Sequence, residues 1–277
     1  DLRRSRGLGD VYKRQPPGSL FAFFIRSQVA HAEITNLDID DAEKATGIHA
    51  IFTAEDLEKH GVKNNLIGVT VKNRDGSNGA SPKRPLLAKN RVRFVGEPIA
   101  LVVADSIQNA KDAAELVEID YDDLPVSVEL EIGENTIHPE APGNVAFEWN
   151  LGNESKTNTA FERAHRVVSM EVDNNRIIAN SMEPRGCYAH WDNERLHISF
   201  SGQGVWVHKS FASEILGLRS EKIRVTNPDV GGGFGMKAMG YPEEFVVSFA
   251  AMQLKKPIRW MSERTEAMLS DNACLLY

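Results

Sequence analysis

The segment of this chain best suited to chemistry is residues 230–237, with the sequence VGGGFGMK. Four glycines within residues 231–235 allow positive φ angles and let unshielded backbone N–H groups approach a large polar group. A bound anionic or pterin-like cofactor is the kind of ligand that such a backbone can cradle. A plain turn between a strand and a helix has the same composition, so the rest of the chain must decide between the two.

The glycine run is not a phosphate-binding P-loop. Gly235 and Lys237 are separated by Met236, and Ala238 stands where a P-loop needs Ser or Thr to hold magnesium.

A dinucleotide-binding motif is the runner-up interpretation of the same glycines. Residues 233–238 fit G-x-G-x-x-A, a strand-like segment at 223–226 precedes them, and Glu263 follows the next strand-like segment. However, Asn-Pro-Asp at residues 227–229 interrupts the chain before the glycines, and the next helix is expected to begin only near Pro242. That helix begins too late for its N-terminus to hold a pyrophosphate at the glycines.

The glycine run belongs to a series of ordered motifs. They are RVRFVGEP at 91–98, DYDDLPV at 120–126, NSMEPR at 180–185, SGQG at 201–204, PDVGGGFG at 228–235, PIRW at 257–260 and ERTE at 263–266. From about Leu20 to Ala273 their order and spacing resemble the molybdenum-binding large subunit of the xanthine dehydrogenase, aldehyde oxidase and carbon monoxide dehydrogenase family. The resemblance implies an α+β fold, in which a hammerhead-type α/β N-terminal domain precedes the first part of a molybdopterin-binding α+β domain.

The resemblance also assigns roles to residues. It places Gln203 near the oxo group of the metal, where a neutral amide can donate a hydrogen bond without adding charge. The residues that it implies for cofactor binding are Gln203, Gly232, Gly233, Phe234 and Gly235. Otherwise Gln203 is an exposed side chain after a strand, and Phe234 is a core residue.

Phe234 and Glu183 are candidates for the substrate pocket. For Glu183 and Arg185, however, a structural ion pair between the two is the favoured interpretation.

The chain shows no pattern for a metal held by protein side chains. None of the eight histidines is paired at metal-ligand spacing, neither of the two cysteines has a partner, and no EF-hand pattern occurs. This suits the family, in which the dithiolene sulfurs of a pterin hold the molybdenum. The resemblance implies a molybdenum–molybdopterin cofactor in its cytosine dinucleotide form. It also implies an iron–sulfur small subunit and an FAD-binding medium subunit as partners, in a dimer of heterotrimers.

Family members are several hundred residues longer, so the chain is expected to be an N-terminal fragment. The general-base glutamate of the family lies further downstream, so we expect no catalytic residue here and no activity of the fragment alone. Residues 1–15, with five Arg and Lys, and residues 274–277 are interpreted as non-native ends.

The expected parent is a molybdenum hydroxylase that oxidises an aldehyde, an N-heterocycle or a CO-like substrate with oxygen from water. Electrons pass to the iron–sulfur and flavin subunits. Ala238 stands where several purine-oxidising members carry an acidic residue, which disfavours purines. The alternatives are a cofactor-free binding or assembly module of the same fold and, less favoured, an NAD-dependent dehydrogenase.

Composition narrows the class of protein further. The 277 residues, of which 42% are hydrophobic, suffice for one large or two medium domains. A net charge of −7 and the lack of a basic patch interleaved with aromatic residues argue against a nucleic-acid partner. No apolar stretch approaches the ~18 residues that would span a bilayer. The cytoplasm is the expected compartment, with folded export to the periplasm left open.

The expected organisation is a hammerhead-like domain at residues 16–132, a linker at 133–152 and the cofactor-binding part at 153–273, with an exposed loop at 64–83. Strands are expected at residues 23–26, 33–39, 99–104, 117–121, 167–172, 187–191, 195–200 and 223–226. Helices are expected at residues 53–60, 106–116, 205–216 and 242–254. Thr53 and Asp56 fit a capping box, and Gly217 fits a helix end. The predicted apolar faces are Ile107, Ala110, Ala114 and Val117 on one helix and Val207, Phe211, Ile215 and Leu218 on another.

Overall fold

A computed structural model of the chain describes residues 18–128, 132–133, 135–172 and 177–272. The predicted non-native ends at 1–15 and 274–277 therefore lie outside the described residues. The described chain divides into two compact units. The first holds residues 18–67, 83–126 and 178–272, and the second holds the remaining described residues, within 68–82 and 127–177.

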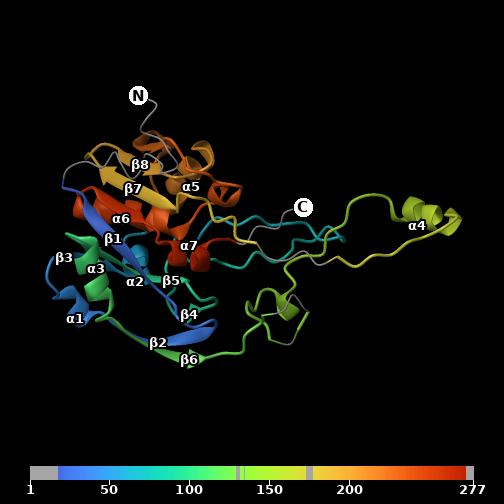
Figure 1. Ribbon diagram of the computed structural model, residues 1–277, viewed down its shortest axis with the longest axis horizontal. Helices are drawn as coiled ribbons and strands as arrows, with labels where there is room; N and C mark the ends of the chain where they lie inside the picture. The colour runs from blue at the N-terminus through green and yellow to red at the C-terminus, as the bar shows by residue number, and fades with distance from the viewer. Residues whose placement is uncertain (1–17, 129–131, 134, 173–176, 273–277) are drawn as a thin grey trace. The chain divides into compact units, whose positions relative to one another are not determined.

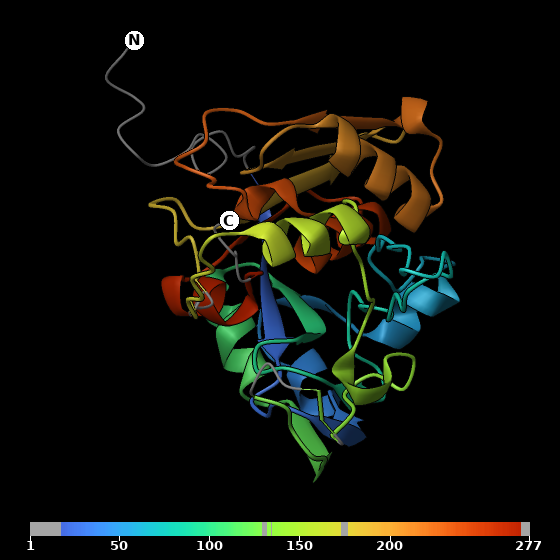
Figure 2. The same cartoon turned by 90° about the vertical axis from the view of Figure 1, so that its right-hand side faces the viewer.

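The first unit is built on one seven-stranded sheet. In spatial order its strands are β3 (Ile48–Phe52), β5 (Pro98–Ala104), β1 (Leu20–Arg26), β10 (Ile258–Met261), β7 (Gly186–Trp191), β8 (Leu196–Phe200) and β9 (Ile223–Thr226). The pairs β1–β10 and β8–β9 are parallel, and the other neighbours are antiparallel. Strands from the N-terminal and C-terminal parts of the sequence thus share a sheet, and blue and orange elements meet in both views (Figure 1, Figure 2).

Helices cover both faces of this sheet at its centre. Every residue of β5 is buried, because alternate side chains face opposite layers. Leu101 and Val103 pack in a core with Phe249 of α6 (Pro242–Leu254), whereas Val102 packs with Ala110 of α3 (Ile107–Ala114). A central strand buried on both faces is expected to be apolar throughout, as β5 is.

The remaining elements of the first unit are short. They are α1 (Asp40–Glu43), α2 (Ala54–Lys59), α5 (Trp206–Leu216), α7 (Arg264–Ser270), the 3₁₀ turns η3 (Ser220–Lys222) and η4 (Met236–Ala238), and a sheet with the order β4 (Arg91–Val92), β2 (Ala32–Asp38) and β6 (Glu118–Asp123). The capping box of Thr53 and Asp56 is confirmed at the start of α2. Gly217 ends α5 with a φ of 65°, as predicted.

The second unit contains little regular structure. It holds the 3₁₀ turn η2 (Pro142–Asn144), the helix α4 (Glu154–Arg163) and an isolated bridge between Lys72 and Asn78. The side chain of Asn153 caps α4 by accepting a hydrogen bond from the N–H of Lys156. The sequence prediction missed this helix because its ten residues, ESKTNTAFER, carry no apolar stripe.

Three other expectations were wrong. Residues 167–172 are not a strand in the structure. On α5, Val207 is 55% exposed and does not belong to the core, whereas Ile215 is buried and Phe211 and Leu218 pack against the core as predicted. His208 is buried as well, and its ring contacts Glu244 of α6 through a hydrogen bond of 2.8 Å. On α3, Ile107 is 40% exposed, whereas Ala110 is buried and Ala114 and Val117 pack against the core as predicted.

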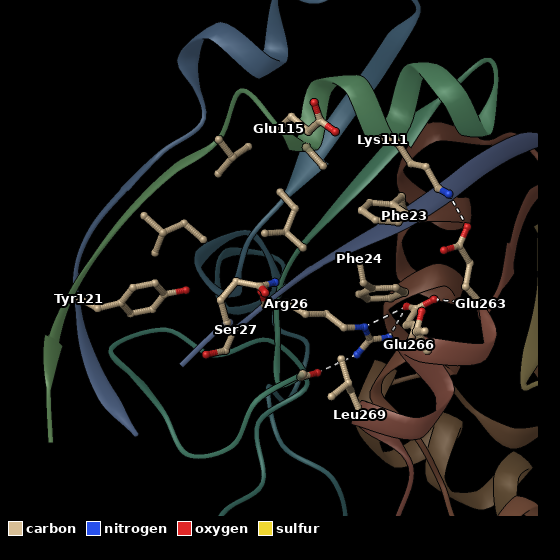
Figure 3. A pocket seen from close by; sticks show the side chains of 17 residues that line it. Phe23, Phe24, Arg26, Ser27, Lys111, Glu115, Tyr121, Glu263, Glu266 and Leu269 are labelled. Atoms are coloured by element: carbon tan, nitrogen blue, oxygen red, sulfur yellow. Dashed lines mark hydrogen bonds and ion pairs between the residues drawn. The ribbon is translucent and has the colours of Figure 1, made fainter. Parts of the chain in front are cut away.

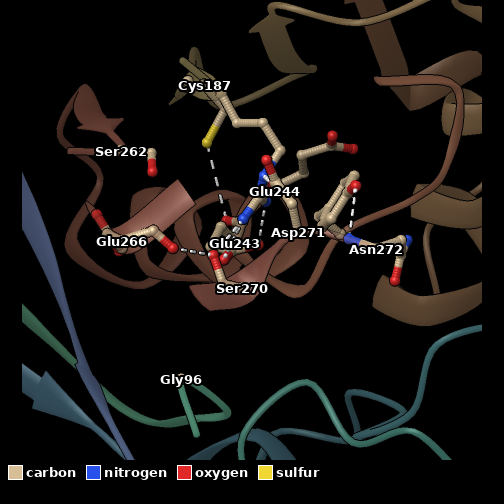
Figure 4. A network of polar contacts seen from close by, with 12 residues as sticks. Gly96, Cys187, Glu243, Glu244, Ser262, Glu266, Ser270, Asp271 and Asn272 are labelled. Atoms are coloured by element: carbon tan, nitrogen blue, oxygen red, sulfur yellow. Dashed lines mark hydrogen bonds and ion pairs between the residues drawn. The ribbon is translucent and has the colours of Figure 1, made fainter. Parts of the chain in front are cut away.

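A buried ion network joins the elements around α6 (Figure 4). Glu243, in the first turn of α6, accepts a hydrogen bond from Arg26 of β1 at 2.7 Å and another from Arg185 at 2.9 Å. Arg26 also pairs with Glu266 of α7 at 2.6 Å, and Arg185 pairs with Asp271. Burial would raise the pKa of Glu243, but the two guanidinium groups outweigh it and lower this pKa to about 2. Glu243 therefore stays charged between two cations.

We predict that Glu243→Gln strongly destabilises the chain. Arg26 and Arg185 would remain buried while losing the charge that they share, and removal of one partner from a buried pair costs about 3–5 kcal/mol. Glu214→Gln is the matched control, because Glu214 pairs with Lys63 at 3.2 Å on the surface and such pairs contribute about 0–1 kcal/mol. Urea denaturation at pH 7 compares the two, and equal losses of unfolding free energy would contradict the prediction.

We also predict that Glu97 makes stability fall as pH rises. This side chain is 2% exposed, and burial raises its pKa to about 6 despite a hydrogen bond from the N–H of Arg93. A raised acid pKa means that the folded state binds the proton more tightly, which costs about 2 kcal/mol between pH 4 and pH 7. The unfolding free energy of Glu97→Gln, relative to the unmodified chain, should rise by about this amount from pH 4 to pH 7. Urea denaturation at both pH values tests this, and a constant difference would refute it.

Candidate functional site

The sheet brings the two candidate segments together. The strands β8 and β9 are parallel neighbours, with Ser199 opposite Thr226, so the segments that follow them leave from the same edge. Gln203 follows β8, and the glycine loop follows β9. The side-chain Oε1 of Gln203 accepts a hydrogen bond from the N–H of Gly235 at 2.9 Å, and the backbone N–H of Gln203 donates to Lys237 O at 2.9 Å. The structure thus brings Gln203 into contact with the glycine loop, to which the resemblance assigns the same cofactor.

This contact fixes the orientation of the Gln203 amide. A backbone N–H can only donate, so the oxygen of the amide must face Gly235 and the NH₂ group must face away from it. Gln203 is exposed, and its NH₂ group makes no hydrogen bond to any part of the chain that the structure describes. The site therefore presents a neutral donor outward.

The loop needs its glycines for close approach and for backbone conformation. A Cβ at Gly233 would lie 2.5 Å from Oε1 of Gln203, so a side chain there would displace the amide. Gly232 and Gly235 have φ angles of 98° and 85°, which disfavour other residues. Phe234 also has a positive φ, 55°, and is 68% exposed. The alternative that Phe234 is a core residue is wrong.

A buried ion pair holds the glycine loop on its inner, buried side. Lys237 Nζ lies 3.0 Å from Oε2 of Glu183, and both side chains are at most 2% exposed. The same oxygen accepts a hydrogen bond from the N–H of Gly231 at 2.8 Å. Burial lowers the pKa of Lys237, and the contact with Glu183 opposes this shift. The pair thus ties the two ends of the loop together.

The predicted ion pair between Glu183 and Arg185 is wrong. Glu183 pairs with Lys237, whereas Arg185 pairs with Glu243 and Asp271. The reason is that two buried cations each need a carboxylate, and Lys237, which is distant from Glu183 in sequence, takes this one in the folded chain. The assignment of Glu183 to a substrate pocket stays a prediction.

Tyr241 connects the loop to the ion network. Its hydroxyl donates to Met236 O at 3.0 Å, and the guanidinium of Arg185 lies 3.8 Å from the centre of its ring. Burial raises the pKa of this hydroxyl to about 12, so the hydroxyl stays protonated and can donate at neutral pH.

A pocket of the first unit is separate from this site. It has a volume of about 550 Å³ and lies among β1, β6, α3 and α7 (Figure 3). Phe23, Tyr121 and Leu269 line it, and Lys111 pairs with Glu263 beside it. Neither Gln203 nor any residue of the glycine loop takes part in its lining.

The described chain offers no obvious metal ligands of its own. Within these residues, no cluster of three or more His, Cys, Asp or Glu side chains could hold a metal ion. Among the described helices, none is long and apolar enough to cross a membrane.

Two known protein families match the chain. The aldehyde oxidase and xanthine dehydrogenase a/b hammerhead domain matches residues 11–125, and the molybdopterin cofactor-binding domain matches residues 137–273.

Similar proteins include the nicotine 6-hydroxylase large subunit of Paenarthrobacter nicotinovorans. It is 36% identical over 97% of this chain and 32% of its own length. The carbon monoxide dehydrogenase large chain of Afipia carboxidovorans is 31% identical over 96% of this chain and 34% of its own length.

Solved structures are similar over nearly the whole chain. The reconstituted CO dehydrogenase from Oligotropha carboxidovorans gives a TM-score of 0.84 at 29% identity, over 99% of this chain and 35% of that one. Quinoline 2-oxidoreductase from Pseudomonas putida 86 gives 0.79 at 26% identity, over 96% of this chain and 34% of that one.

The fold and the matched domains define a protein of the molybdopterin-dependent oxidoreductase class. Within this class, the chain belongs to the family of the molybdenum-binding large subunits of xanthine dehydrogenases, aldehyde oxidases and carbon monoxide dehydrogenases. It spans about a third of the length of the curated relatives that it matches.

The structure argues against a dinucleotide-binding motif at the glycines. The glycines lead into the turn η4, and α6 begins only at Pro242, so the glycines do not lie at a helix N-terminus. The described sheet is also largely antiparallel, whereas a dinucleotide fold needs a mostly parallel one.

We predict that Lys237→Met lowers the unfolding free energy by about 3–5 kcal/mol, because Glu183 would keep a buried carboxylate without its cation. Adding Glu183→Gln should restore part of the loss. Lys256→Met, at an exposed lysine, is the control. Urea denaturation of these three variants and the unmodified chain checks this, and a double variant no more stable than Lys237→Met would show that the two residues do not act as a pair.

Proposed function

We propose that this chain forms part of a molybdenum hydroxylase large subunit, in which Gln203 and the loop of Gly232, Gly233, Phe234 and Gly235 contact a molybdenum–molybdopterin cofactor. The observation that carries the proposal is the hydrogen bond between Gln203 and Gly235, which fixes an outward-facing amide donor beside a glycine backbone. Family membership supplies the identity of the cofactor.

The residues present fit such a group. A pterin dithiolene holds the metal itself, so the protein supplies hydrogen-bond donors and a fitting surface rather than metal ligands. The described residues contain no group of three or more side chains that could hold a metal ion. The NH₂ group of Gln203 is available as a donor to an oxygen of the cofactor, and the glycines admit a bulky ligand close to the backbone. When bound, the cofactor supplies two-electron redox chemistry. The role of this chain is to orient it.

For the parent protein we propose oxidation of an N-heterocycle with oxygen derived from water. The name of the relative at 36% identity denotes a nicotine hydroxylase, and one similar structure is named as a quinoline oxidoreductase. The exposed ring of Phe234, in the same loop as Gly235, offers an aromatic face on which a flat heterocycle can stack. Aldehydes and carbon monoxide are the competing substrates, as the names of other relatives indicate.

The proposal extends to cofactor form and assembly. It includes the cytosine dinucleotide form of molybdopterin, an iron–sulfur small subunit, an FAD-binding medium subunit, a dimer of heterotrimers and a cytoplasmic location. One relative is named as a subunit of a dehydrogenase complex, which supports a multi-subunit parent.

The test is the molybdenum and pterin content of the full-length parent, purified with its partner subunits. We expect one molybdenum and one pterin for each large subunit. Gln203→Ala should weaken retention of the cofactor about tenfold, as loss of one hydrogen bond to a bound group does. Gly233→Ala should act similarly, because its Cβ displaces Gln203. Gln253→Ala, at an exposed glutamine of α6, should have no effect.

A folded parent without molybdenum or pterin would overturn the proposal and favour a cofactor-free binding module. With cofactor present, turnover of aldehydes or carbon monoxide in preference to N-heterocycles would contradict only the proposed substrate.

A further inference from the structure

A buried histidine and a buried glutamate join the first turns of α5 and α6. His208 is the third residue of α5, and Glu244 is the third residue of α6. The Nδ1 atom of His208 lies 2.8 Å from Oε2 of Glu244, and both residues are buried. Burial raises the pKa of Glu244, and the contact with His208 opposes this shift. A polar contact therefore holds the two helices together where they begin.

Both helices begin directly beyond the candidate site. Gln203 lies three residues before α5, and the glycine loop is followed by η4 and then by α6. At the site, the backbone N–H of Gln203 already joins the two segments by donating to Lys237 O. The contact between His208 and Glu244 joins the same two stretches of chain on the helix side. The segments that meet at the site thus meet again in the helices that follow them.

The ring of His208 also packs against the strand end that leads to Gln203. Its centre lies 4.2 Å from that of Phe200, the last residue of β8. A Cβ at Gly202 would lie 1.9 Å from Cε2 of Phe200, so this ring lies directly against the backbone next to Gln203. His208 therefore contacts the Gln203 segment on both sides, through Phe200 before it and through the start of α5 after it.

Stability alone does not explain this pair. The Nε2 atom of His208 is buried and has no hydrogen-bond partner among the residues that the structure describes. A buried polar atom without a partner costs free energy. Replacing a buried polar or charged pair by apolar side chains of similar volume is often neutral or stabilising. In some proteins such pairs instead fix a single arrangement of the elements that they join.

We propose that His208 is a positioning residue of the cofactor site, which holds Gln203 against the glycine loop through its contacts with Glu244 and Phe200. The inference rests on the proposed function, because the ligand that Gln203 would meet is the cofactor named there. The hydrogen bond from Gly235 to Gln203 is exposed, and one such bond contributes little net free energy. Its geometry must therefore be set by the backbone segments that carry its two partners, and His208 joins these segments.

Two measurements on the parent enzyme, purified with its partner subunits, test this. Hydrogen exchange of the Gly235 amide, followed by mass spectrometry, reports the contact with Gln203 whether or not a cofactor is bound. The rate at which molybdenum is lost on dialysis reports how firmly the cofactor is held. His208→Phe keeps a ring against Phe200 and removes the hydrogen bond to Glu244. We expect about tenfold faster exchange of the Gly235 amide and about tenfold faster loss of molybdenum.

The conservative variant is His208→Asn. The amide nitrogen of asparagine takes nearly the place of Nδ1 and can donate to Glu244, so this variant should recover most of both properties. Glu244→Gln keeps an acceptor and should behave likewise, whereas Glu244→Met should behave as His208→Phe does. An asparagine variant as impaired as His208→Phe would overturn the proposal, because the hydrogen bond would then not be the contact that matters.

Two further variants separate positioning from general stability. Ile51→Ala truncates a buried side chain in the core on the other face of the sheet, so it should lower stability and change neither measurement. Adding His208→Phe to Gln203→Ala should release molybdenum no faster than Gln203→Ala alone, because His208 acts through Gln203. Equal effects of Ile51→Ala and His208→Phe on exchange would overturn the proposal, and so would an unchanged exchange rate in His208→Phe.

The outcomes also distinguish this inference from the proposed function. If the unmodified parent contains no molybdenum, the proposed function fails, whereas faster exchange of Gly235 in His208→Phe still supports the positioning of Gln203. If the unmodified parent contains molybdenum and His208→Phe retains it fully, the proposed function stands and this inference is wrong.

Discussion

The carboxylate of Glu243, shared between Arg26 and Arg185, is the interaction on which the rest of the first unit depends. Arg26 comes from β1, near the beginning of the described chain, and Arg185 directly precedes β7. The charge lies in the first turn of α6, where the helix dipole also favours an anion. Because all three groups are buried, each charge requires the others, and β1 is held within the same sheet as the strands of the C-terminal part.

The same network reaches the candidate site through Tyr241. Arg185 packs on its ring, and its hydroxyl holds the carbonyl of Met236 directly after the glycines. Lys237 and Glu183 hold the loop from the same inner side. The loop is therefore fixed by contacts beneath it, so its glycine backbone, Phe234 and the amide of Gln203 can remain free on the outside. A ligand can therefore bind to the exposed side of the loop without disturbing the buried contacts that hold it.

The sequence predicted the elements whose signals are local. The capping box at Thr53 and the stop at Gly217 depend on residues within one turn, and both are confirmed. The pairing of Gln203 with the glycine loop could be predicted because ordered motifs identified the family. The partner of Glu183 could not, because Arg185 is near in sequence whereas Lys237 is near only in the folded chain. The burial of His208 on α5 likewise could not be predicted, because its partner Glu244 is distant in sequence.

The strand expected at residues 167–172 was wrong for a different reason. Alternating apolar and polar residues favour a strand, but a strand forms only where a neighbouring strand pairs with it, and the alternation does not show whether one is present. The candidate site likewise depends on its surroundings. A hydrogen bond from Gln203 to a ligand is strongest where water is excluded, yet Gln203 is exposed and Phe234 is 68% exposed. Under the proposed function, the bound cofactor itself must exclude water from the amide of Gln203, so that the hydrogen bond gains strength only when the site is filled.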